Sequence, residues 1–81
     1  MNHKEDSMTR HEIQAQFAAT ILKATGLTVE VTHRDAGKWT ISGDDNVVRK
    51  AAEWLRVNVG MVVESIDYDD DLEESFAYLA A

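Results

Sequence analysis

The residues best suited to chemistry in this sequence are five in a row, Asp67-Tyr68-Asp69-Asp70-Asp71. Carboxylates at alternate positions are the ligands that calcium-binding loops direct at one ion. Counted from Asp67, however, the sixth position of such a loop is Leu72 instead of glycine, and the twelfth is Tyr78 instead of glutamate. The pattern excludes an EF-hand. It leaves three alternatives, which are a divalent-ion site, a solvated turn and an acidic patch that binds a protein.

Two histidines have spacings that chemistry can use. His33 stands beside Asp35 and has the residue type of a general base, but the chain offers no cysteine and no serine nucleophile in a strained turn to accompany it. His3 is third from the amino terminus, a geometry that binds Cu(II) or Ni(II) and requires only an exposed terminus. Zero cysteines also exclude disulfides and Cys-based zinc sites. We therefore expect no catalytic residue, no metal and no cofactor, and a non-enzymatic protein.

The charge of the chain is concentrated in its last third. The net charge is −7, and residues 1–56 contain eight acidic and eight basic side chains, which cancel. Such a concentration repels nucleic acid and anionic membranes and attracts basic protein surfaces. We therefore expect a basic protein partner and neither direct nucleic-acid binding nor membrane binding. Residues 57–81 contain no basic residue and seven acidic ones: Glu64, Asp67, Asp69, Asp70, Asp71, Glu73 and Glu74.

Aromatic residues extend this candidate partner-binding set. Tyr68 and Tyr78 flank the acidic run, and an aromatic-plus-acidic surface suits Arg-rich partners through stacking and salt bridges. Trp54 lies at the edge of the apolar stripe of its expected helix, where it either covers the core or stands partly exposed as an interface anchor. We include all three residues with the seven acidic ones as candidates for partner binding.

The elements that position these residues form one small domain over residues 9–81, after a flexible polar leader at residues 1–8. Thr9 and Glu12 form a capping-box pattern ahead of a helix that ends at Gly26. Alternating apolar residues predict a strand over 27–33, and Gly37 predicts a bulged hairpin connection over 34–38.

The organising unit of the chain is the strand over 38–42, the Gly43-Asp44-Asp45 turn and a helix that continues to about Val57. Trp39 and Ile41 share the core face of that strand. A third strand is expected over 61–68, and the Asp71-Leu72-Glu73-Glu74 pattern predicts a short third helix. The predicted fold is an α+β two-layer sandwich, α-β-β-α-β-α. Its three-stranded, mostly antiparallel sheet has the preferred strand order 2-1-3, with the helices on one face.

The strand and helix over Trp39–Leu55 resemble the closing strand-and-helix unit of a K-homology RNA-binding domain. The features that carry this resemblance are a hydrophobic strand, an Ile-Ser-Gly turn and the spacing Val-x-x-Ala-x-x-x-Leu. The sequence departs from the family where RNA is bound, because it contains no Gly-x-x-Gly loop between two helices and no basic groove. The resemblance therefore implies a local fold and does not carry RNA binding to this chain.

Two functional hypotheses follow. In the first, the acidic tract binds the basic surface of a nucleic-acid-binding protein as an inhibitor or nucleic-acid mimic. Small, acidic, cysteine-free domains of this composition resemble phage or plasmid counter-defence proteins such as anti-CRISPR inhibitors. In the second, the protein is a structural or regulatory module, including a homodimer, that uses Trp54 and the polar sheet face, and its acids serve only solubility. The composition and the polar amino terminus predict a cytoplasmic protein under either hypothesis.

Overall fold

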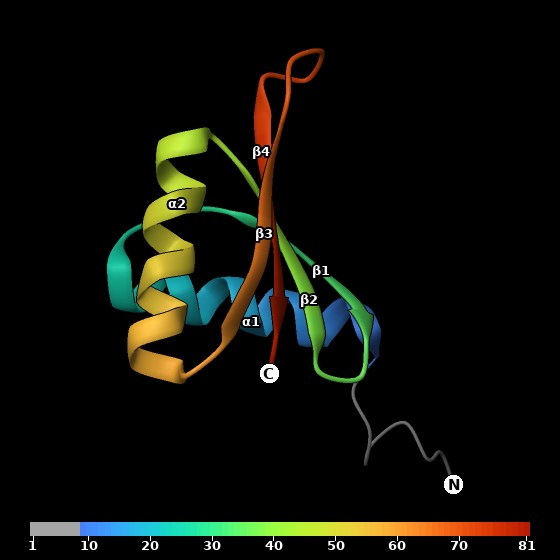
Figure 1. The fold of residues 1–81 in the computed structure, drawn as a ribbon. Coiled ribbons are helices and arrows are strands. Elements are labelled where there is room, and N and C mark those ends of the chain that lie inside the picture. The colour runs from blue at the N-terminus through green and yellow to red at the C-terminus, as the bar shows by residue number, and fades with distance from the viewer. Residues whose placement is uncertain (1–8) are drawn as a thin grey trace, which may run out of the picture.

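A computed structural model describes residues 9–81 as two helical segments packed on one antiparallel sheet (Figure 1). This arrangement confirms the predicted α+β class. The predicted leader at residues 1–8, including His3, lies outside the described residues. The elements in chain order are α1 (Arg10–Thr25), β1 (Glu30–Asp35), β2 (Lys38–Gly43), α2 (Asp45–Trp54), η2 (Leu55–Val59), β3 (Val62–Asp69) and β4 (Glu74–Ala80).

The sheet has four strands in the order β1-β2-β4-β3, and every neighbouring pair is antiparallel. The predicted order 2-1-3 with three strands is therefore wrong. As expected from the connection through α2, β3 runs parallel to β2, but β4 lies between them and pairs with both. The sheet thus consists of two hairpins joined through β2 and β4.

The predicted third helix is instead the central strand β4. Leu72, Phe76 and Leu79 have helical spacing, but burial alternates along β4 with a period of two. Ser75, Ala77 and Leu79 are fully buried against the helices, whereas Phe76 is only partly buried. The unpaired edges of β2 and β3 offer β4 a hydrogen-bonding partner on each side, and this tertiary gain outweighs the helical preference of its alanines.

The ends of the helices agree with the capping patterns in the sequence. Thr9 and Glu12 exchange hydrogen bonds as a capping box, and Gly26 ends α1 with a positive φ of 77°. The Asp44 side chain accepts hydrogen bonds from the first turn of α2. The π-helical turn η2 extends α2 until Gly60, whose N–H donates to the carbonyl of Leu55.

One apolar core fills the space between the helices and the sheet. It includes both residues expected on the core face of β2, since Ile41 is fully buried and Trp39 packs against the core while partly exposed. On β3, Val63 and Ile66 pack inward, whereas Val62 is 58% exposed. No helix within residues 9–81 is both long enough and apolar enough to cross a membrane. The buried core consists of Ile21, Val29, Ile41, Val48, Ala51, Ala52, Leu55, Met61, Ala77 and Leu79.

The opposite face of the sheet carries no helix among the described residues. Directly paired residues of an antiparallel sheet share a face, so Thr40 with Tyr78, and Ser42 with Phe76, lie on this open face. Thr40 and Ser42 are nonetheless only 8% exposed, which is consistent with their large aromatic neighbours shielding them from solvent. The open face therefore carries polar side chains on β2 and aromatic side chains on β4.

Candidate protein-interaction surface

The acidic run lies in the β3–β4 hairpin, whose tip projects beyond the end of α2 (Figure 1). The turn closes through Asp69, whose Oδ1 accepts hydrogen bonds from the backbone N–H groups of Asp71 at 2.9 Å and Leu72 at 3.1 Å. Glu73 takes a positive φ of 55° to bring the chain into β4. The residues that predicted a helix start therefore form a tight turn, and Asp69 has a structural role in it.

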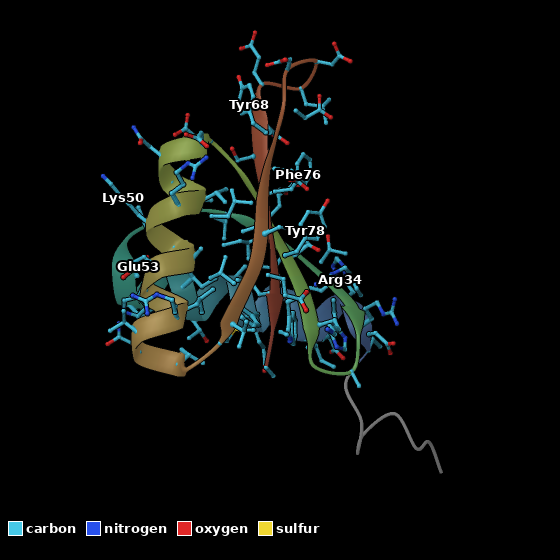
Figure 2. The ribbon with its side chains drawn as sticks, in the orientation of Figure 1. Arg34, Lys50, Glu53, Tyr68, Phe76 and Tyr78 are labelled. Carbon is cyan, nitrogen blue, oxygen red and sulfur yellow. The ribbon has the colours of Figure 1, made fainter. Side chains whose placement is uncertain are left out.

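Four of the predicted acidic residues meet around one shallow, open depression of about 570 Å³. Figure 2 shows Tyr68, Phe76 and Tyr78 following one another along the hairpin. Asp67 pairs with Phe76 on the open face of the sheet, whereas Tyr68 pairs with Ser75 and lies toward the helix side. We call this set the acidic hairpin surface. Its members are Asp67, Tyr68, Asp69, Asp70, Asp71, Phe76 and Tyr78.

The carboxylates of this surface have no counter-charge among residues 9–81. The ion pairs in this part of the chain join Glu64 to Arg34 and Lys38, Asp45 to Arg49, and Glu53 to Arg56. Asp67, Asp69, Asp70, Asp71, Glu73 and Glu74 appear in none of these pairs. The hairpin tip therefore presents concentrated negative charge to solvent, a field that attracts cationic partners.

Glu64 is separated from the other predicted acids by its own ion pairs. It occupies a β-bulge opposite Tyr78, three residues or about 10 Å along the strand from Asp67. A 2.9 Å hydrogen bond from the Lys38 ammonium, with a smaller contribution from Arg34, lowers the pKa of Glu64. Its charge is already balanced within the fold, so it is a weaker candidate for binding a partner than the sequence alone suggests.

Arg34 and Phe76 lie at the acidic hairpin surface, although no sequence pattern had marked them as candidates for partner binding. The Arg34 guanidinium lies 5.3 Å from the centre of the Tyr78 ring and donates to the backbone carbonyls of Trp39 and Leu79. Phe76 lines the depression beside the aspartates. The alternation Phe76-x-Tyr78 was the available signal, because two aromatic residues spaced by two lie on one face of a strand.

Trp54 is not brought to the acidic hairpin surface. It is the last residue of α2 and packs, half-buried, against the core on the helix side of the sheet. Phe76 and Tyr78 lie on the opposite face. Of the two alternatives from the sequence, the structure therefore supports a Trp54 that covers the core, and it leaves Trp54 outside the candidate surface.

The other candidate chemistry also has structural explanations. The His33 ring packs 4.3 Å from the Trp39 ring, while the Asp35 carboxylate accepts the N–H of Ala36 in the hairpin turn. No group of three or more His, Asp or Glu side chains in residues 9–81 is arranged to hold a metal ion.

Comparison of the chain with protein-family models, with curated proteins and with solved structures gives no significant match.

Proposed function

We propose that this protein is a non-enzymatic interaction module whose acidic hairpin surface binds the basic surface of another protein. The supporting observation is the cluster of four aspartates around one depression, beside three aromatic rings and without a counter-charge among the described residues. Crowded carboxylates repel one another, and a cationic partner relieves this repulsion. Nucleic-acid-binding proteins carry arrays of Lys and Arg for phosphates, so a protein of this class is the proposed partner.

The mode of action that we propose is competition with nucleic acid. Carboxylates at the hairpin tip would occupy the places of phosphates, while the rings of Tyr68 and Phe76 offer stacking surfaces to arginine side chains. The Tyr78 ring already has Arg34 of the same chain over it. Long-range attraction would raise the rate of association, and the affinity would fall as salt is added. An inhibitor of a nucleic-acid-handling protein, as in phage or plasmid counter-defence, would have these properties.

The direct test is affinity capture with the tagged protein, elution in steps of increasing salt, and identification by mass spectrometry. We expect a nucleic-acid-handling protein to be retained at low salt and released by added DNA or RNA. The variant Asp69→Asn/Asp70→Asn/Asp71→Asn should retain at least tenfold less of it. Asparagine keeps the side-chain oxygen that accepts both turn hydrogen bonds at position 69, so the hairpin is preserved.

A charge-matched control separates a local site from total charge. Glu12→Gln/Asp35→Asn/Glu53→Gln removes three negative charges from the first turn of α1, the end of β1 and α2, and none of these residues belongs to the acidic hairpin surface. We expect this control to retain the partner as the unmodified protein does. Equal retention by the Asp69/Asp70/Asp71 variant and the unmodified protein would refute the proposal.

Self-association through the open sheet face is the second candidate function. It is supported by the partly buried Phe76 and Tyr78 on a face that carries no helix among the described residues. Sedimentation velocity distinguishes the two candidates, because a homodimer held by this face depends on protein concentration and persists in high salt. A Tyr78→Ala variant should then become monomeric, whereas a protein that is monomeric throughout refutes this candidate.

A further inference from the structure

The two edge strands of the sheet differ in the hydrogen bonds that they receive from the rest of the fold. β1 and β3 are the edge strands, and each directs alternate backbone N–H and C=O groups away from its neighbour. On the β1 edge, the backbone N–H of His33 donates to Gln14 Oε1 of α1 at 2.8 Å. Within residues 9–81, no backbone or side-chain hydrogen bond comes to the outer edge of β3. The β3 edge is therefore available for pairing with an added strand.

The two faces of β3 carry side chains of different kinds, acidic on one face and apolar or aromatic on the other. Toward the open face, β3 presents Asp67 and Asp69, which are two residues apart and have no counter-charge among residues 9–81. Toward the helix side it presents Ile66 and Tyr68, and the Tyr68 side chain is 53% exposed. A strand that added here would place its own alternating side chains next to these two rows. Its best complement has Lys or Arg on one side and apolar residues on the other.

The same rows disfavour a second copy of this chain as the added strand. An antiparallel pair of two β3 strands centred on Tyr68 would place Asp67 of one copy opposite Asp69 of the other, and like charges directly opposite on paired strands are destabilising. The bulge at Glu64 also interrupts the flat ladder that edge-to-edge self-association requires. Charge complementarity therefore selects a basic segment from another protein.

We propose that β3 binds an extended segment of its partner by strand addition, and that this segment alternates Lys or Arg with apolar residues. The inference rests on the proposed function, because it specifies how the acidic hairpin surface engages a basic protein. Backbone hydrogen bonds from the free edge supply affinity, and the rows of Asp67 and Asp69 and of Ile66 and Tyr68 supply specificity.

The probe for this proposal is a fluorescein-labelled eight-residue peptide of alternating lysine and valine, measured by fluorescence anisotropy. Two isomeric versions carry N-methyl groups either on every lysine or on every valine. Alternate N–H groups of a strand point to opposite edges, so one isomer loses the donors that face β3 and the other keeps them. We expect one isomer to bind within threefold of the unmodified peptide and the other to bind at least tenfold more weakly.

Variants of the protein locate the peptide. Asp67→Asn/Asp69→Asn should weaken binding at least tenfold, whereas Glu64→Gln should change it less than twofold because Lys38 and Arg34 already neutralise Glu64. In hydrogen exchange of the full chain, saturating peptide should slow the amides of β3 and leave those of β1 unchanged. Slowing confined to β1 would overturn the proposal.

The failures of the two proposals are distinguishable. Equal affinity of both N-methylated isomers, or no binding of any peptide at millimolar concentration, overturns strand addition while the capture of a basic protein through the hairpin tip still stands. Unchanged capture by the Asp69→Asn/Asp70→Asn/Asp71→Asn variant overturns the proposed function itself.

Discussion

The two ends of the β3–β4 hairpin differ in almost every physical respect. At the end near Ala80, β4 lies in the middle of the sheet, Leu79 is fully buried, and Glu64 is paired with cations. At the turn end, the strands project past α2, Leu72 is 59% exposed, and the aspartates have no counter-charge among the described residues. One continuous pair of strands therefore contains both fully buried core residues and the concentrated acidic charge of the described fold.

This difference indicates that stability and recognition are separated along the hairpin. The buried end stabilises the fold through apolar burial and through the hydrogen bonds of β4 to two neighbouring strands. The turn end carries exposed charge, which does not stabilise the core. Substitutions at the buried end should therefore change the free energy of unfolding, and those at the turn should change binding. We expect the effects of substitution on stability to decrease from the buried end of the hairpin to its charged residues.

Leu79→Ala should lower the free energy of unfolding by about 2–5 kcal/mol, because it leaves a cavity at a fully buried position of the central strand. Urea denaturation followed by tryptophan fluorescence measures this loss. The control is Leu72→Ala in the exposed turn, for which we expect a change within about 0.5 kcal/mol. Similar losses in both variants would contradict the separation.

Near the turn, β4 is joined to α2 by a hydrogen bond. The hydroxyl of the buried Ser75 donates to the Asp45 carboxylate at 2.5 Å. This bond, with a further contribution from Arg49, lowers the pKa of Asp45 below its ordinary value of 3.8. A lowered folded-state pKa stabilises the fold above pH 3.8, and this contribution disappears as the pH falls through the folded value. Asp45→Asn should therefore lower the urea midpoint at pH 7, and its difference from the unmodified protein should shrink below pH 3.8.

A double-mutant cycle tests the same contact. Because Asp45 and Ser75 act through one hydrogen bond, Asp45→Asn should cost less stability in a Ser75→Ala background than in the unmodified protein. Strictly additive losses at pH 7 would show that the bond does not couple α2 to β4.

Asp69→Asn/Asp70→Asn/Asp71→Asn should leave the free energy of unfolding within about 0.5 kcal/mol of the unmodified value, or raise it. The reason is that the variant removes repulsion between adjacent carboxylates while asparagine keeps the turn acceptor at position 69. Added salt should stabilise the unmodified protein more than the variant, because screening weakens the same repulsion. Unfolding by calorimetry in 0.05 M and 0.5 M NaCl checks this; a strongly destabilised variant would assign the aspartates to the fold.

Glu64→Gln should have the smallest effect, a slight fall of the urea midpoint at pH 7. The hydrogen bond from Lys38 and the charge of Arg34 lower the pKa of Glu64 from 4.5, so its contribution is present above pH 4.5 and is lost at lower pH. The Lys38 and Glu64 side chains are 44% and 37% exposed, and solvent and salt screen such a pair. The fall should disappear in 1 M NaCl, and a fall that persists there would indicate a packing role for Glu64.

Local patterns predicted the first two-thirds of the fold because each element carries its own boundary signals. Thr9 and Glu12 mark the start of α1, Gly26 marks its end, and Asp44 marks the start of α2. Gly37 has the positive φ of 71° and lies in the bulged hairpin connection that the sequence predicted. These signals act within a few residues and require no knowledge of the rest of the chain.

The strand over residues 61–68 was predicted, but the segment after it was mispredicted as a helix because the contacts that make it a strand lie outside the segment itself. The spacing of Leu72, Phe76 and Leu79 favours a helix, and the turn before β4 contains no glycine to indicate a hairpin. Pairing with β3 on one side and with β2, more than thirty residues earlier, on the other makes alternation the favourable pattern for β4. The pairing of β4 with β3 determines the candidate surface, since it places Phe76 opposite Asp67, whereas Trp54 lies on the other side of the sheet.

The sequence by itself determined the α+β class, the elements α1, β1, β2, α2 and β3, and the concentration of acidic residues in the last third. These properties depend on composition and on short-range capping and periodicity, which any single segment carries. The tertiary structure decided that residues 74–80 form a strand and that β3 is an edge strand of the described sheet. It also decided that Glu64 is neutralised while Asp67 and its neighbours have no counter-charge in the described chain. Each of these outcomes depends on which strands lie side by side, and that choice is made by burial and hydrogen bonding over the whole sheet.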